Sequence, residues 1–308
     1  MPHKIIKSLL IVIILAAFFL LFYKTELFNI FKTNQTTPDL NNLLDKKATV
    51  LVKVRLDNSG LQDIYVKLDN GREVFYGSYA DIYNGHYHWA EYHNGRVYFI
   101  RRVGSLDGDD WRDELWRLDA RGRDKKIYSL RGFDFRVSPD EKFIAIDSEE
   151  QLFIRNQSDQ KNISFSVSDL ALDNPAIASL VGWSDNSQFF WGDVHVMSKT
   201  VNFFRFNSVT GAVDKFVAPP DYYGRDLAFN LNAGAMVYSD YPFFFDSNDD
   251  EQFIASQAIV KLKLHDLFTQ KEIVIAESKT KLFFPRWIND STVEYNNPDG
   301  EGRLQFNN

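Results

Sequence analysis

The stretch Val137-Ser138-Pro139-Asp140-Glu141-Lys142-Phe143-Ile144-Ala145-Ile146 decides the fold of this chain. It has the pattern of a strand end, a polar turn and a second apolar strand. The same pattern recurs, in order along the chain, in three further segments, Trp183 to Trp191, Phe229 to Tyr238 and Trp287 to Tyr295, and in a more degenerate form from Tyr92 to Phe99.

The segments are regularly spaced. With the residue before each turn as reference, the positions are 92, 137, 183, 229 and 287, and the spacings are 45, 46, 46 and 58 residues. A period near 46 is typical of a four-stranded propeller blade, which buries its two faces by stacking against its neighbours around an axis. The sequence therefore predicts an all-β fold, a β-propeller.

The repeat resembles that of TolB-like propellers, whose blades carry an aromatic-Ser-Pro-Asp-Gly turn between the first and second strands. Ser138-Pro139-Asp140 keeps this turn nearly intact. The position of the glycine is taken by Glu141, Ser187 and Ala233 in successive units. The resemblance covers roughly Tyr87 to Phe306; it implies the propeller fold and says little about function.

The length of the chain gives the number of blades. The 261 residues from Ala48 to Asn308, divided by 46, give 5.7, which favours six blades over five blades with an irregular extension. The first and last units each show three strands. We expect the ring to close by pairing the N-terminal strand, Val50 to Val54, with the last unit.

A transmembrane helix is expected before the propeller. Ile5 to Tyr23 is apolar except for Lys7 and Ser8, and as a helix it would be about 28 Å long, enough to cross a bilayer. No small-residue cleavage site follows it, and the basic residues before it favour a cytoplasmic N-terminus. We therefore expect a cytoplasmic tip and anchor at 1–24 and a linker at 25–47 that forms a stalk or a short docking helix. The propeller, at 48–308, is expected on the outer, periplasmic or extracellular, side of the cytoplasmic membrane.

Composition excludes several functions. A net charge of -7 with a pI near 5.4 does not favour nucleic acid as a partner. The absence of cysteine excludes disulfides, thiolate metal sites and a cysteine nucleophile. Neither the G-x-S-x-G motif nor the H-E-x-x-H motif occurs. We therefore assign no catalytic residue, and no cofactor beyond the calcium or zinc considered next, and we favour a protein that is not an enzyme over one that is.

Two weak metal patterns are present. His86 and His88 would share one face of a strand, with the spacing of two zinc or copper ligands, but a polar strand face is the favoured explanation. Asp246, Asn248 and Asp250 have the spacing of the first ligands of a calcium loop, and the likeness ends there because Glu and Gln stand where Gly and Glu are required. A solvated acidic loop is the alternative.

Partner-binding candidates lie in two long loops, 104–114 and 243–252. They are Trp111 and the triplet Phe243, Phe244 and Phe245, which cannot all point inward on a strand. These residues favour a protein- or peptide-binding scaffold in the cell envelope. The alternatives are a propeller hydrolase or lyase acting on glycans or lactones, and a sensor that binds a small ligand in the centre of the ring.

Overall fold

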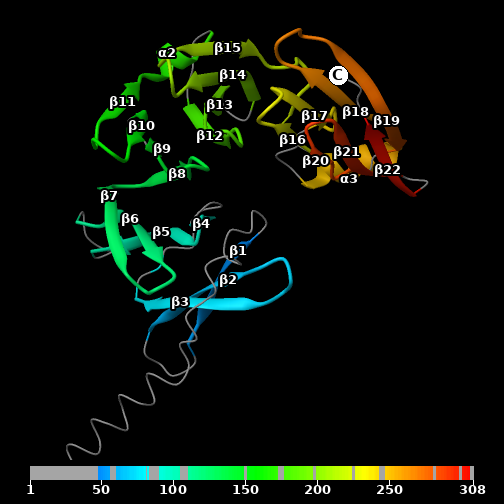
Figure 1. The fold of residues 1–308 in the computed structure, drawn as a ribbon. Coiled ribbons are helices and arrows are strands. Elements are labelled where there is room, and N and C mark those ends of the chain that lie inside the picture. The colour runs from blue at the N-terminus through cyan, green and yellow to red at the C-terminus, as the bar shows by residue number, and fades with distance from the viewer. Residues whose placement is uncertain are drawn as a thin grey trace, which may run out of the picture.

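The strands form six antiparallel sheets that follow one another along the chain. The computed structural model describes residues 48–55, 60–80, 82, 90–104, 110–148, 151–172, 177–196, 199–223, 226–242, 247–279, 282–297 and 300–305. Figure 1 shows the sheets arranged side by side along a ring. The all-β prediction and the preference for six blades are confirmed.

Sheets two to five have four strands each, and sheets one and six have three. Sheets one to three contain β1 (Thr49–Val54), β2 (Gln62–Lys67), β3 (Glu73–Tyr79); β4 (Ala90–His93), β5 (Arg96–Val103), β6 (Arg112–Asp119), β7 (Asp124–Leu130); and β8 (Phe133–Val137), β9 (Phe143–Ser148), β10 (Leu152–Asn156), β11 (Asn162–Phe165). Sheets four to six contain β12 (Ile177–Trp183), β13 (Phe189–Val196), β14 (Lys199–Asn207), β15 (Val213–Val217); β16 (Ala228–Asn230), β17 (Ala235–Ser239), β18 (Ile259–Asp266), β19 (Glu272–Lys279); and β20 (Arg286–Asn289), β21 (Thr292–Asn297), β22 (Gly300–Gln305). Two helices, α2 (Val167–Leu170) and α3 (Ser247–Ser256), lie in connections between strands.

The repeated turns are stabilised by the residues that the sequence pattern singles out. In sheet three the Ser138 hydroxyl accepts a hydrogen bond from the backbone N–H of Phe143 at 3.0 Å. The residue at the glycine position has a left-handed backbone, with φ of 59° at Glu141 and 61° at Ser187. In sheet five the left-handed residue is Gly234, with φ of 64°, one position after Ala233. That turn has the same length as in sheets three and four, because Phe229 pairs with Met236 as Val137 pairs with Ile144, and only the left-handed residue lies one position later.

Each sheet packs against its neighbours through apolar side chains. Five core clusters of the described residues join sheet one to two, two to three, three to four, four to five and five to six. No cluster of the described residues joins sheet six to sheet one. β1 pairs with β2 and not with the last unit, so the predicted closure by strand pairing is not found in this part of the chain.

The two three-stranded sheets lack different strands. In sheet one the turn between β2 and β3 has backbone hydrogen bonds from Leu68 to Arg72 and from Gly71 to Leu68. The turn between the third and fourth strands of sheet two has the same pair of bonds, at Asp119 and Gly122. By this match, sheet one contains the second to fourth strands of a blade. Sheet six, which begins with the repeat turn after Trp287, contains the first to third.

The connections lie at two ends of the sheets. Because the strands alternate in direction, the links from second to third strand and from one sheet to the next share one end, which we call the loop face. The short turns from first to second and from third to fourth strand share the other end, the turn face. The long loops at 104–111 and 240–258, as well as α2 and α3, belong to the loop face.

Among the described residues, no helix is long and apolar enough to cross a membrane. The predicted anchor, Ile5 to Tyr23, lies outside the described residues.

Candidate functional site

A cluster of titratable side chains lies where sheets three and four reach the loop face. Asp134 near the start of β8 and Asp147 near the end of β9 are direct partners in the strand register, so their carboxyl groups share one side of the sheet. Burial, together with the nearby carboxylates of Asp134 and Asp193, raises the pKa of Asp147 to about 7, against the opposing effect of His195. Asp147 therefore takes up or releases a proton near neutral pH.

His195 on β13 is the second titratable group of this cluster. Its Nε2 lies 2.9 Å from the Ser179 hydroxyl and 3.3 Å from an Asp193 carboxylate oxygen. Its Nδ1 lies 3.2 Å from the Thr200 hydroxyl. The hydrogen bond with Asp193 raises the pKa of His195, and burial opposes this effect. The site therefore places a carboxyl group and an imidazole near each other, both able to exchange protons near neutral pH.

The geometry argues against a serine nucleophile at this site. A catalytic triad requires the serine on one ring nitrogen of the histidine and the carboxylate on the other. Here Ser179 and Asp193 both approach Nε2, and Thr200 occupies the Nδ1 side. The described contacts suit general acid–base chemistry or polar ligand binding better than covalent catalysis.

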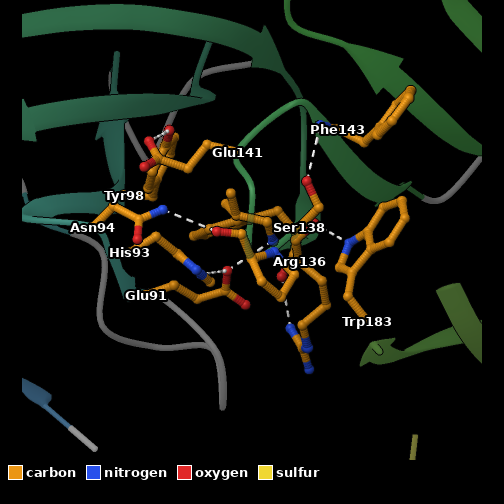
Figure 2. A network of polar contacts seen from close by, with 12 residues as sticks. Glu91, His93, Asn94, Tyr98, Arg136, Ser138, Glu141, Phe143 and Trp183 are labelled. Carbon is orange, nitrogen blue, oxygen red and sulfur yellow. Dashed lines mark hydrogen bonds and ion pairs between the residues drawn. The ribbon is translucent and has the colours of Figure 1, made fainter. Parts of the chain in front are cut away.

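A second polar network joins sheet two to sheet three, and Figure 2 shows it from close by. Glu91 accepts a hydrogen bond from the Val137 backbone N–H at 2.7 Å and lies 2.9 Å from His93 Nε2. The Asn94 amide donates to the Pro139 carbonyl oxygen at 2.9 Å. These contacts use backbone groups of the neighbouring repeat, so this network holds the blades in register.

The same arrangement continues along the ring. The Trp183 indole donates to the Arg136 carbonyl oxygen at 3.0 Å, as Figure 2 shows. The Trp287 indole donates to the Ala228 carbonyl oxygen at 3.0 Å. Asn232 in the turn of sheet five accepts from the Asp185 backbone N–H in sheet four at 2.8 Å. The residues that define the sequence repeat are therefore explained by contacts between blades.

Trp111 is held by two arginines in the structure. Its ring lies 4.3 Å from the Arg102 guanidinium carbon and 4.9 Å from that of Arg131. Arg102 also makes two hydrogen bonds to the fully buried Asp113, at 2.8 and 3.0 Å. Trp111 is half-buried on the loop face, where its remaining surface is available to a partner.

The other predicted site residues are only partly described. Asn248 and Asp250 lie in the helix α3 rather than in a loop, and the Asp250 carboxylate accepts a hydrogen bond from the Tyr241 hydroxyl at 2.9 Å. His86, His88, Asp246 and the triplet Phe243, Phe244 and Phe245 lie outside the described residues. No group of three or more histidine or acidic side chains with metal-binding geometry occurs in the described part of the chain.

Comparisons with known proteins identify the fold and no more. No protein-family model matches the sequence, and no curated protein matches it. An oligogalacturonate lyase in complex with manganese superposes with a TM-score of 0.55 at 11% identity, covering 84% of this chain and 74% of the lyase. Dipeptidyl peptidase 4 of Porphyromonas gingivalis gives a TM-score of 0.50 at 11% identity, covering 84% and 44% of the two chains.

TolB of Acinetobacter baumannii gives a TM-score of 0.48 at 13% identity, covering 84% of this chain. This chain spans 61% of the length of TolB. At these identities, similarity establishes a shared fold and leaves the activity open. The chain has the β-propeller fold that its repeats predicted.

Proposed function

We propose that this chain is a membrane-anchored propeller that binds a protein or peptide of the cell envelope through its loop face. One observation supports this proposal. Large apolar side chains between 38% and 56% exposed gather on the loop face of sheets four and five and on the connections beside it: Leu172, Ile177, Val196, Val217, Ile254 and Ile259. Apolar side chains exposed together on the face that carries long loops favour a docking function.

The polar cluster lies beside these side chains. Ile177 is directly opposite His195 in the strand register, and Val196 follows His195 along β13. An apolar surface that surrounds a few polar groups is typical of a binding site, because the apolar part provides affinity and the polar part orientation. The loop face of sheet four offers both.

Site-specific photocrosslinking tests this proposal. A photoreactive amino acid is placed at Val217 or at Ile254 on the loop face, and at Val209, which is 78% exposed on the turn face, as the control. In intact cells we expect both loop-face positions to label the same protein and the control to leave it unlabelled. Equal labelling from Val209 would contradict a loop-face site.

The location of the propeller is a separate part of the proposal. The apolar stretch Ile5 to Tyr23 supports a single anchor with the N-terminus inside and the propeller outside. Protease added to spheroplasts is expected to degrade the propeller and leave a small N-terminal membrane fragment. Protection of the whole chain would place the propeller in the cytoplasm.

An enzyme is the second candidate, favoured by the electrostatic influence that Asp147 and His195 have on each other's pKa. Two groups that exchange protons near neutral pH are what a lyase or hydrolase of glycans or lactones needs. An oligogalacturonate lyase has the same fold. A glycan and lactone screen would detect such an activity, and Asp147→Asn and His195→Gln should each abolish it if the cluster carries it.

A further inference from the structure

Within the described residues, the first and last sheets of the ring each have one face without a neighbouring sheet packed on it. On sheet one, the side chains that pack towards sheet two include Ile64 and Val66. The opposite face carries Leu51, Tyr65 and Phe75, which form one row across the three strands because they are direct partners in register. The Tyr65 and Phe75 rings are 5.5 Å apart.

This row is incompletely covered by its own sheet. Lys53 extends over the Tyr65 ring, with its Nζ 4.6 Å from the ring centroid. Phe75 nevertheless remains 42% exposed. No core cluster of the described residues covers this face of sheet one.

The free face of sheet six, in contrast, is polar and suited to contact with solvent. The corresponding row across its three strands is Arg286, Glu294 and Arg303, again direct partners in register. Glu294 lies 2.7 Å from Arg286 and 3.4 Å from Arg303, and the arginine side chains are 73% and 61% exposed. Terminal repeats need such a polar outer face to stay soluble. Sheet one has aromatic and aliphatic side chains in the same place, so its free face fits an apolar partner.

The nearest apolar segment belongs to the chain itself. Residue 48 leads directly into β1, the strand at one edge of this face. The preceding residues include Leu40, Leu43 and Leu44. Eight residues can span up to about 27 Å, whereas three strands about 4.8 Å apart make a face only about 10 Å wide. These leucines therefore reach the whole Leu51–Tyr65–Phe75 row.

We propose that residues 27–47 of this chain cover the row formed by Leu51, Tyr65 and Phe75. The sequence alone leaves a stalk and a short docking helix open for this segment, and the proposal favours docking. The segment then serves as the outer layer of sheet one and removes its aromatic side chains from water. The docking stands independently of the proposed function; its consequence, that the propeller is held close to the membrane surface, rests on the proposed anchor.

Cysteine crosslinking of the full-length chain tests the docking, and the chain contains no native cysteine to interfere. One cysteine replaces Leu40, Leu43 or Leu44, and the second is introduced by Phe75→Cys, or by Lys67→Cys at the edge of the same face. The matched control combines Leu43→Cys with Val209→Cys on the turn face. Disulfide formation is followed in detergent by the shift in gel mobility on mild oxidation.

We expect at least one leucine position to form an intramolecular disulfide with the sheet-one face at least about 10-fold faster than the control pair, because docking raises the effective concentration of the two thiols. The rate should not depend on protein concentration. Three results would overturn the docking: no disulfide at any leucine position, disulfide-linked dimers that increase with concentration, or rapid disulfide formation between Phe75→Cys and Arg303→Cys. The second would identify another copy of the chain as the occupant, and the third would show that sheet six closes over sheet one.

Discussion

Replacing Asp147 by asparagine should stabilise the protein, and more at high pH than at low pH. Folding raises the pKa of Asp147 from 3.8 to about 7. The folded chain therefore holds this proton more tightly than the unfolded chain. The favourable effect of the protonated carboxyl is complete below pH 3.8, and it is lost as the pH rises to about 7.

The size of the effect follows from the shift in pKa. A shift of about three units, at about 1.4 kcal/mol each, sets a ceiling of about 4 kcal/mol above pH 7. Asp147 is only partly buried, so water reduces this value. Asparagine keeps the shape of the side chain and cannot ionise. We expect Asp147→Asn to raise the free energy of unfolding at pH 8 by about 1 to 3 kcal/mol, and at pH 5 by clearly less.

Urea unfolding of the full-length chain in detergent, followed by tryptophan fluorescence at pH 5 and pH 8, measures this difference. Asp159→Asn is the matched control, because Asp159 lies in an exposed turn of the same sheet, with its side chain 45% exposed. The control should change stability equally at the two pH values. An Asp147→Asn protein no more stable than the wild type at pH 8 would refute the reasoning about the cluster.

Three further predictions concern stability. Burial lowers the pKa of His265, whose ring nitrogens have no hydrogen-bond partner among the described residues. The wild type should therefore lose stability as the pH falls from 7 to 5. The His265→Leu protein should lose less stability over the same pH range, as measured by urea unfolding. Gly192→Ala should lower the urea midpoint by the equivalent of about 2 to 3 kcal/mol, because the new Cβ would lie 2.6 Å from the Ser179 carbonyl oxygen and closer still to the Phe204 ring; an unchanged midpoint would refute this packing. Trp183→Phe removes the indole hydrogen bond to sheet three and should cost about 1 to 2 kcal/mol in the same assay, whereas an unchanged protein would show that the bond contributes nothing.

The fold class could be predicted from the sequence because the blades repeat the same strand–turn–strand pattern. The anchors at 137 and 183 each end a first strand, and β10, β11, β14 and β15 follow as the third and fourth strands that a four-stranded blade requires. The turn after Phe229 was misread by one residue, because only the backbone shows that Gly234 and not Ala233 takes the left-handed conformation. The pattern identified the repeat, and the backbone determined the exact turn.

The candidate site was harder to predict, because its residues come from different repeats. The hairpin around Ser138 and Phe143 would have placed Asp134 opposite Asp147 by counting outward from the turn, so that pair was accessible to sequence reasoning. The raised pKa of Asp147 depends on burial and on side chains of sheet four, which no local pattern reveals. The histidine pair considered as metal ligands, His86 and His88, lies outside the described residues. His195, which belongs to none of the sequence motifs, lies in the polar cluster with Asp147.

The five interfaces between six sheets have a mechanical consequence. Among the described residues no such cluster joins the last sheet to the first, so this part of the chain forms an open arc of sheets. Small rotations at the five interfaces would add up in the distance between sheet one and sheet six, while the side chains within each interface stay packed. Any change in the distance between these two sheets would therefore distribute its energetic cost over all five interfaces.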